Sequence, residues 1–458
     1  MSEYLTFSSE PSGRHEGKKH IIIIGAGIIG VCTAYYLVKH PQFDPEKYHI
    51  SLVESKRVAG GASGKAGGLL ALWAFPQQLV PLSFQLHQEL SDLYDGENNW
   101  DYRRLTTVSI EGDLTEFHAE EESDAESERQ VTEKASPGTE LPPKKTSKVT
   151  KQRDSKKLPS DLNWITEQFV TSCSSLGGKD TTAQVHPYRF TNFILKEAVK
   201  DSKGALELIL GKVNHILYSM DTGVATGISY EPTSAKSEKH EPVSLKGDQI
   251  VLSVGPWTSK ILPDCPISGL RAHSITIAPY RDQRVSPYAI FTEYKIGNKY
   301  VSPEIYARKD EVFVCGEGDS AVDVPETTDD VEVVKSKCDD LFSQVGKMSS
   351  MLRKGRILKR QACYLPVLDV PSSSGPLIGE TNVDNLFLCS GHSCWGINNA
   401  PGSGKVMSEL LLEGKAKSAN ISTLDPSLYF DASVLVDDQD EVEEKDEVDE
   451  KNGEVDRD

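Results

Sequence analysis

Long apolar runs are missing from this sequence of 458 residues. No stretch approaches the roughly 18 apolar residues that a membrane-spanning helix needs, so no transmembrane segment is expected. Residues 1–19 are polar and lack the apolar core of a secretory leader. The last three residues, Asp456-Arg457-Asp458, match neither a peroxisomal nor an ER-retention signal. These absences favour a cytoplasmic protein.

Paired cysteines are also missing. The eight cysteines are scattered along the chain, and no two form a C-x-x-C pair. This pattern argues against a disulfide framework and against a cysteine-based zinc site. We expect reduced thiols and no metal site.

A basic excess is absent, and no nucleic-acid partner is expected. The formal net charge is −19, but residues 436–458 hold thirteen acids and three bases, a net of −10, which leaves −9 for the rest. The acidity therefore describes a tail, residues 431–458, which we expect to be disordered. Residues 1–18 and an insertion at 112–159 are also expected to be disordered. The insertion is acidic first and basic later, and a solvated charge run is favoured there over a contact with anionic lipid or a partner.

The most informative stretch of the chain runs from His20 to Gly30. Four isoleucines form an apolar strand that leads into a G-x-G-x-x-G turn and a helix, and Glu54 ends a second strand about 20 residues on. The glycines would allow a tight turn, close approach of a pyrophosphate and close packing of the helix, in that order. Glu54 would accept hydrogen bonds from ribose hydroxyls. The predicted cofactor contacts here are Gly25, Ala26, Gly27, Ile28, Ile29, Gly30 and Glu54, and the alternative is a glycine-rich turn in another kind of α/β domain.

Strands that alternate with helices, followed by a strand-rich middle, predict a nucleotide domain with a second sheet domain inserted. Helices are expected at Leu162–Leu176, Phe190–Lys200 and Val406–Leu412. Strands are expected at Asp101–Ile110, Leu206–Leu210, Gln249–Val254, His273–Ile277, Tyr288–Glu293, Val312–Cys315 and Leu386–Cys389.

A second glycine-rich segment, Gly60 to Gly68, follows Glu54 and suits a cofactor that is bulkier than NAD. From this point the chain resembles the D-amino-acid-oxidase and sarcosine-oxidase-like family of FAD-dependent oxidoreductases. The resemblance continues in family order through Val185-His186-Pro187, Leu210 to Val213, Val251 to Trp257, Gly375 to Gly379 and Ser390 to Gly396. It implies further FAD contacts at Ser63, Gly64, Gly67, Gly68, Val213, Gly255, Trp257, Cys363, Gly391, Gly396 and Ile397.

The resemblance implies a fold and a domain division. The fold would be α/β, with a Rossmann-like FAD-binding domain and an inserted antiparallel-sheet substrate domain of α+β type. The FAD-binding domain would comprise residues 19–100, 179–262 and 370–430, and the substrate domain residues 101–111, 160–178 and 263–369. The chain looks most like a fungal subgroup of cytoplasmic oxidoreductases that has been linked to late-endosome-to-Golgi traffic.

The sequence departs from the family where relatives place cations that hold a substrate carboxylate. Leu365, Trp395, Leu69 and Leu72 stand near those positions, so a carboxylate would lack the partner that burial requires. Either another cation takes over or the substrate has no carboxylate. The candidate cations are Arg308, Arg360, Arg271 and Lys65, although surface or structural roles are favoured for them.

The expected function is FAD-dependent oxidation of a C–N bond in an amine or amino acid, with oxygen as a possible electron acceptor. Backbone N–H groups at Gly396 and Ile397 would stabilise negative charge on the reduced flavin. His392, Trp395 and Arg308 are the predicted catalytic residues, with a plain loop histidine as the equal alternative for His392. Cys363 lies near the cysteine that carries FAD covalently in sarcosine oxidases, but a buried inert thiol is favoured there. The alternative functions are a flavin-bound trafficking protein with little turnover and, less favoured, an NAD-dependent dehydrogenase.

Overall fold

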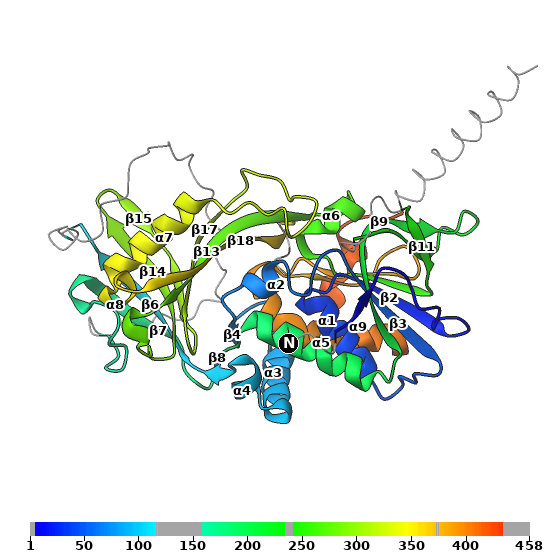
Figure 1. Ribbon diagram of the computed structural model, residues 1–458, viewed down its shortest axis with the longest axis horizontal. Coiled ribbons are helices and arrows are strands. Elements are labelled where there is room, and N and C mark those ends of the chain that lie inside the picture. Colours follow the sequence, from blue (N-terminus) through cyan, green and yellow to red (C-terminus); the bar gives the residue numbers. More distant parts are fainter. Residues whose placement is uncertain are drawn as a thin grey trace, which may run out of the picture.

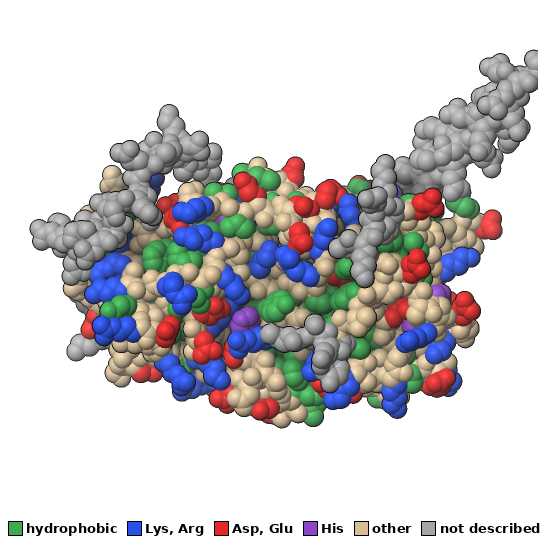
Figure 2. Space-filling model, in the orientation of Figure 1, with side chains coloured by type: hydrophobic (Ala, Val, Ile, Leu, Met, Phe, Trp, Pro, Cys, Tyr) green, Lys and Arg blue, Asp and Glu red, His purple; other side chains and the backbone are tan. Residues whose placement is uncertain are grey.

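The computed structural model describes residues 5–115, 117, 158–233, 241–371, 373 and 375–433. Within these residues the chain forms two halves that lie side by side, each built on a large sheet (Figure 1). No helix among the described residues is both long and apolar enough to cross a membrane. On the face shown in Figure 2, basic and acidic side chains are interspersed, which gives that face no field of a single sign.

The first large sheet has nine strands in the described part of the chain, and its centre is parallel. The parallel strands are, in order, β9 (Leu206–Tyr218), β3 (Tyr48–Glu54), β2 (Lys19–Ile24), β12 (Gln249–Leu252) and β20 (Leu386–Ser390). Three antiparallel strands widen it, β10 (Ala225–Pro232), β11 (Val243–Lys246) and β19 (Leu377–Glu380), and β1 (Phe7–Ser8) pairs with β9. The isoleucines of β2 are buried throughout, because both faces of a central parallel strand are covered.

Helices pack on this sheet and on one another. They are α1 (Ile28–Lys39), α2 (Ala62–Lys65), α3 (Val80–Tyr94), α4 (Gly96–Trp100), α5 (Pro187–Asp201), α6 (Thr258–Ile261) and α9 (Gly396–Glu413). The helices α1, α5 and α9 lie together in Figure 1, and their apolar side chains share one core with Ile21 and Ile23. A Cβ atom on Gly404 would lie 2.5 Å from the Cys32 backbone, so α9 crosses α1 closely only because this residue is glycine.

The second large sheet has eight strands among the described residues, and most of its pairs are antiparallel. Its strands are β18 (Arg356–Leu368), β13 (Ile267–Ala278), β17 (Val312–Asp319), β16 (Glu304–Ala307), β14 (Tyr288–Ile296), β6 (Thr106–Asp113) and β7 (Val170–Gly177), with β15 (Lys299–Val301) beside β14. The helices α7 (Lys335–Met348) and α8 (Ser350–Arg353) accompany it. A small sheet contains β4 (Leu69–Ala71), β8 (Thr182–Gln184) and β5 (Arg103–Arg104). The predicted fold class is confirmed.

Two predictions about local structure are wrong. Leu162–Leu176 is not a helix, because β7 occupies Val170–Gly177 and pairs antiparallel with β6 after a short 3-10 turn at Glu167–Phe169. Pairing with the neighbouring strand of the sheet decides the conformation of this segment. Residues 5–18 are not disordered, because β1 pairs with β9 and the Ser12 N–H donates to the Glu207 carboxylate at 3.0 Å.

The predicted domain division stays a prediction. Its three FAD-binding segments supply the parallel strands of the first sheet, and its three substrate-domain segments supply most of the second sheet. Most of the insertion expected at 112–159 and of the tail expected at 431–458 lies outside the described residues.

Candidate functional site

A cavity of about 540 Å³ lies at the carboxyl ends of the parallel strands. This is where ligands bind in open α/β sheets. Both glycine-rich segments and the N-terminus of α9 line it. Twelve of the predicted site residues contribute to its wall: Gly25, Gly27, Ile28, Ile29, Glu54, Ser63, Val213, Gly255, Trp257, His392, Gly396 and Ile397.

The three glycines of the G-x-G-x-x-G turn occupy three different environments. Gly25 has a φ of +99° and leaves the strand in a conformation that favours glycine. A Cβ atom on Gly30 would lie 2.1 Å from the Gly25 carbonyl oxygen, so Gly30 is required for packing. A Cβ atom on Gly27 would meet only the Ser63 hydroxyl, at 3.2 Å, and Gly27 lines the cavity. Gly25 and Gly30 thus have the turn and packing geometry expected of them, and close approach of a pyrophosphate at Gly27 stays a prediction.

Glu54 and Ser63 fix the geometry of this turn. The Glu54 carboxylate accepts hydrogen bonds from the backbone N–H groups of Ala26 and Lys56, both at 2.9 Å. Burial raises the pKa of Glu54 above its ordinary value. The Ser63 hydroxyl accepts from the Ile28 N–H at 2.9 Å, at the start of α1. The Ser55 hydroxyl and the Arg57 N–H also donate to the Glu54 Oε1, at 3.2 Å and 3.3 Å. Within the described residues Oε2 accepts only from Ala26, so Oε2 retains acceptor capacity for a ligand hydroxyl.

The far wall of the cavity is formed by His392 and the first turn of α9. The His392 Nε2 lies 2.9 Å from the Ser403 hydroxyl, and burial lowers the pKa of His392 to about 3, so the ring is neutral at pH 7. Gly396 and Ile397 stand at the N-terminus of an 18-residue helix, where N–H groups and the helix dipole favour negative charge.

The residues that line the cavity fit FAD. The N-terminus of α1 suits a pyrophosphate, and Glu54 suits a ribose hydroxyl. A Cβ atom on Gly255 would meet nothing within 4 Å, which leaves room for a ligand along that wall. Gly27, Glu54, Ser63 and the first turn of α9 would hold the cofactor between them.

Several predicted cofactor contacts do not line the cavity. Close packing against neighbouring atoms explains why three of these positions are glycine. Cβ atoms on Gly64 and Gly68 would lie 2.2 Å and 2.0 Å from backbone carbonyl oxygens, and one on Gly67 would lie 2.3 Å from the Tyr306 ring. Ala26, Gly30 and Gly391 also stand behind the wall.

Two predicted catalytic residues also lie outside the wall. Arg308 pairs with Glu311 at 2.7 Å and donates to the Ala66 carbonyl oxygen at 2.5 Å. Trp395 packs edge-on against Trp73, with ring centroids 5.4 Å apart. Cys363, predicted near the flavin, is buried on β18, and burial raises the pKa of its thiol to about 11.

Sequence reasoning missed other residues of the wall. Lys212 and Lys260 both pair with Glu326, at 2.5 Å and 2.6 Å, and all three line the cavity. Lys212 could have been inferred from its neighbour Val213 on the same strand. Glu326 carries no sequence signal, because a loop outside both sheets brings it to the site.

Residues 20–410 match the family described as FAD dependent oxidoreductase. The chain belongs to this family. A Saccharomyces cerevisiae protein named "Putative oxidoreductase TDA3" is 49% identical, over 94% of this chain and 98% of that protein. A Schizosaccharomyces pombe protein named "Putative oxidoreductase C1F5.03c" is 36% identical, over 89% of this chain and 98% of that protein.

Solved structures of low identity show the same fold. Iminodiacetate oxidase from Chelativorans sp. BNC1 has a TM-score of 0.62 at 15% identity, over 89% of this chain and 98% of that one. Glycine oxidase from Bacillus cereus has a TM-score of 0.61 at 16% identity, over 88% of this chain and 96% of that one. Family membership makes the protein an FAD-dependent oxidoreductase and FAD its cofactor. The predicted family is confirmed, while the predicted link to endosome-to-Golgi traffic and the cytoplasmic or late-endosomal location stay predictions.

Proposed function

We propose that the protein oxidises a C–N bond of a small amine that carries no carboxylate. The structural neighbours named above are an iminodiacetate oxidase and a glycine oxidase, which supports C–N oxidation as the reaction. Both of those substrates carry a carboxylate. The proposal therefore departs from them at the substrate, and the reason lies in the side chains beside the cofactor cavity.

The candidate carboxylate-binding cations are engaged elsewhere. Arg308 pairs with Glu311 and Arg360 pairs with Asp339, each at 2.7 Å. Arg271 pairs with two acids, Asp319 at 3.1 Å and Glu332 at 2.8 Å, and Lys65 donates to the Ala362 carbonyl oxygen at 3.0 Å. The acids neutralise the charges of the three arginines, which therefore offer little to a substrate carboxylate, while a neutral carbonyl oxygen holds the Lys65 ammonium group.

An apolar, largely aromatic group of side chains stands beside the cavity instead. Its rings are linked in sequence: Trp395 to Trp73 at 5.4 Å, Trp73 to Phe291 at 6.0 Å, and Phe291 to Tyr306 at 6.2 Å. We call these four residues, with Phe75 and Phe313, the aromatic cluster. Leu69 and Leu72, which stand where relatives place cations, pack in the same core.

The aromatic cluster adjoins the cavity at two places. Ala66 lines the cavity, and the next residue, Gly67, packs directly on the Tyr306 ring. Cys394 also lines the cavity, and the next residue is Trp395 of the cluster. A substrate in contact with these rings would therefore lie next to the cofactor.

A carboxylate at the edge of the cluster supplies the polar contact. Glu304 accepts hydrogen bonds from the Tyr306 hydroxyl and from the Cys315 thiol, the latter at 3.7 Å. Aromatic faces attract cations, and a nearby acid adds to that attraction. This pairing of rings with Glu304 is the observation that carries the proposal, because it suits an ammonium group and not a carboxylate.

The chemistry divides between the cofactor and the chain. FAD, when bound, supplies a hydride acceptor. In our proposal the aromatic cluster excludes water and orients the amine, and Glu304 holds its ammonium group and takes up a proton when the neutral amine forms. The N–H groups at the start of α9 favour the charge that accompanies reduction. Oxygen is the proposed electron acceptor.

The test is an anaerobic screen of the FAD-loaded protein with primary amines, N-methyl amines and amino acids, followed by loss of flavin absorbance. We expect reduction by amines and little by the matching amino acids. Fast reduction by an amino acid that is lost in Arg308→Ala or Arg360→Ala would restore an amino-acid oxidase. No reduction by any compound would favour the second candidate, a flavin-bound protein of intracellular traffic with little turnover.

A further inference from the structure

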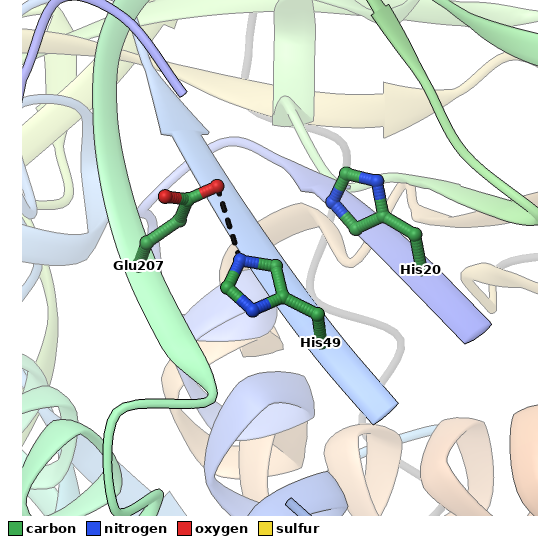
Figure 3. Close-up of side chains that lie close together, drawn as sticks. All are labelled: His20, His49 and Glu207. Atoms are coloured by element: carbon green, nitrogen blue, oxygen red, sulfur yellow. Dashed lines mark ion pairs between the residues drawn. The ribbon is translucent and has the colours of Figure 1, made fainter. Parts of the chain in front are cut away.

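A second group of chemically active side chains lies at the opposite ends of the same parallel strands. His20, His49 and Glu207 stand near the amino ends of β2, β3 and β9. His20 and His49 are direct partners in the sheet register, so both side chains project from the same face. Figure 3 shows the three side chains converging from three adjacent strands. One ligand atom from each lies within 4.8 Å of the others.

This site is buried, and one histidine is already oriented. His20 is 3% exposed and His49 is fully buried. The His20 Nδ1 lies 2.7 Å from the Lys246 carbonyl oxygen, which can only accept, so Nδ1 carries the proton. The His20 Nε2 faces the Ser51 hydroxyl at 2.8 Å and is the nitrogen that points into this site. A histidine whose other nitrogen donates to a backbone carbonyl has the usual orientation of a metal ligand.

The site has too few protons for its acceptors. The Ser51 hydroxyl lies 2.8 Å from the His20 Nε2 and 2.7 Å from the Glu207 Oε1, but it has one proton to give to these two acceptors. The His49 Nε2 lies in ion-pair contact with the same Glu207 oxygen at 3.1 Å, and its Nδ1 has no hydrogen-bond partner in the described part of the chain. A buried imidazole nitrogen that lacks a hydrogen-bond partner is costly.

We propose that His20, His49 and Glu207 bind a divalent transition-metal ion, with Zn²⁺ as the best match. Two imidazole nitrogens and one carboxylate form a donor set that zinc accepts readily, and three protein ligands leave a fourth position for a water or hydroxyl. The ion satisfies the lone pairs of His20 and His49, which the protons of the cluster do not.

The site has a structural role in this proposal, because it lies at the amino ends of the strands and the cofactor cavity lies at their carboxyl ends. The N-terminal segment covers it. The Ser12 N–H donates to Glu207 at 3.0 Å, and the His15 ring stacks on His20 with centroids 4.6 Å apart. A bound ion would therefore fix the segment that carries β1 against the sheet.

The competing explanation is a buried ion pair without a metal, in which His49 carries a second proton. Burial alone would raise the pKa of Glu207, but His49, Ser12 and Ser51 outweigh it and lower that pKa to about 2. A protonated His49 would account for the negative charge of the Glu207 carboxylate as well as a metal ion does. It would still leave one proton too few for the contacts that His20 and Ser51 make.

The deciding measurement is metal binding by the full-length, FAD-loaded protein. Elemental analysis as purified, and calorimetric titration of chelator-treated protein with Zn²⁺, should give one ion per chain. Co²⁺ in its place should give absorption bands of a tetrahedral site at wavelengths beyond the flavin bands. Zn²⁺ should raise the melting temperature, and chelator should lower it.

Variants assign the ligands. His49→Gln and Glu207→Gln should each weaken Zn²⁺ binding by at least about tenfold. The matched control is His40→Gln, because His40 also contacts a carboxylate, Glu413, at 3.0 Å, but without a second histidine. Flavin content in every sample reports whether the fold is kept. A wild-type protein that binds no Zn²⁺ or Co²⁺ stoichiometrically, or a folded His49→Gln variant that binds as tightly as wild type, overturns the proposal in favour of the ion pair.

Discussion

The hydroxyl of Ser63 accepts a hydrogen bond from the backbone N–H of Ile28 at 2.9 Å. This contact joins the second glycine-rich segment to the first turn of α1, where the side chain acts as an N-cap supplied from elsewhere in the chain. Ser63→Ala should lower the free energy of unfolding by about 0.5–2 kcal/mol and weaken FAD binding. Denaturant unfolding and FAD titration check this, with Ser63→Thr, which keeps the hydroxyl, as the control. Equal stability and affinity in all three proteins would show that the contact contributes nothing.

Gly27 and Gly30 should respond differently to added side chains. Gly27→Val places a side chain inside the cavity, where only the Ser63 hydroxyl lies close to the Cβ position, so folding should survive and FAD binding should fail. Gly30→Ala forces a Cβ atom to 2.1 Å from a carbonyl oxygen, so it should destabilise the protein by about 1–3 kcal/mol. Flavin absorbance and unfolding curves separate the two effects. A Gly27→Val protein that purifies yellow would contradict the cavity assignment.

The strand, turn and helix around Gly25 to Gly30 were predictable because the interactions that form them are local. Glu54 was predictable for the same reason, since it ends the neighbouring strand. The fold class followed from the alternation of strands and helices. The wrong helix at Leu162–Leu176 shows the limit of prediction from local sequence. The strand β7 in this segment is defined by its pairing with β6, and its own residues show no alternating apolar pattern that would have indicated a strand.

Contacts between distant segments were not predictable from one sequence. Arg308 was a candidate cation, and the structure places the Ala66 carbonyl oxygen beside it; Trp395 was a predicted catalytic residue, and Trp73 and Phe75 pack on its ring. His20, His49 and Glu207 share a site only because the sheet order is β9, β3, β2. Their spacing along the chain matches no short metal-binding motif, which explains why no metal site was expected.

FAD should be bound without a covalent link to Cys363. This thiol does not line the cavity, and its pKa of about 11 keeps it protonated at neutral pH, whereas the thiolate is the nucleophile. Acid precipitation should leave the yellow colour in the supernatant, and Cys363→Ser should keep its flavin. A yellow pellet from wild type that is colourless in Cys363→Ser would establish the covalent bond.

Buried neutral histidines should make stability fall as the pH drops below about 6.5. Burial lowers the pKa to about 4 in His87, His186 and His273, against an unfolded value of about 6.5. Between these values the unfolded chain binds more protons than the folded one, so each histidine removes up to about 1.4 kcal/mol of stability per pH unit as the pH falls.

Unfolding free energies at pH 7, 6 and 5 measure this slope. Carboxylates such as Asp319, whose pKa is lowered by Lys337 and Arg271 against the effect of burial, lose their contribution only below about pH 4. The slope of unfolding free energy against pH reports the number of protons that the chain takes up on unfolding. Between pH 6 and 5, His87→Gln should lower that number by close to one. A flat profile in wild type would mean that these rings are protonated in the folded state.

Glu304→Gln should separate substrate binding from cofactor binding. The carboxylate stands at the edge of the aromatic cluster and is absent from the wall of the cavity. If it holds an ammonium group, its loss should raise the amine concentration that half-saturates flavin reduction by about tenfold or more, since a hydrogen bond to a charged group contributes about 1.5–3 kcal/mol. FAD content should not change. Anaerobic stopped-flow reduction over a range of amine concentrations measures this, with Glu293→Gln, an exposed acid on β14, as the matched control. Unchanged half-saturation in Glu304→Gln, or an equal shift in Glu293→Gln, would remove Glu304 from the substrate site and contradict the proposed ammonium site.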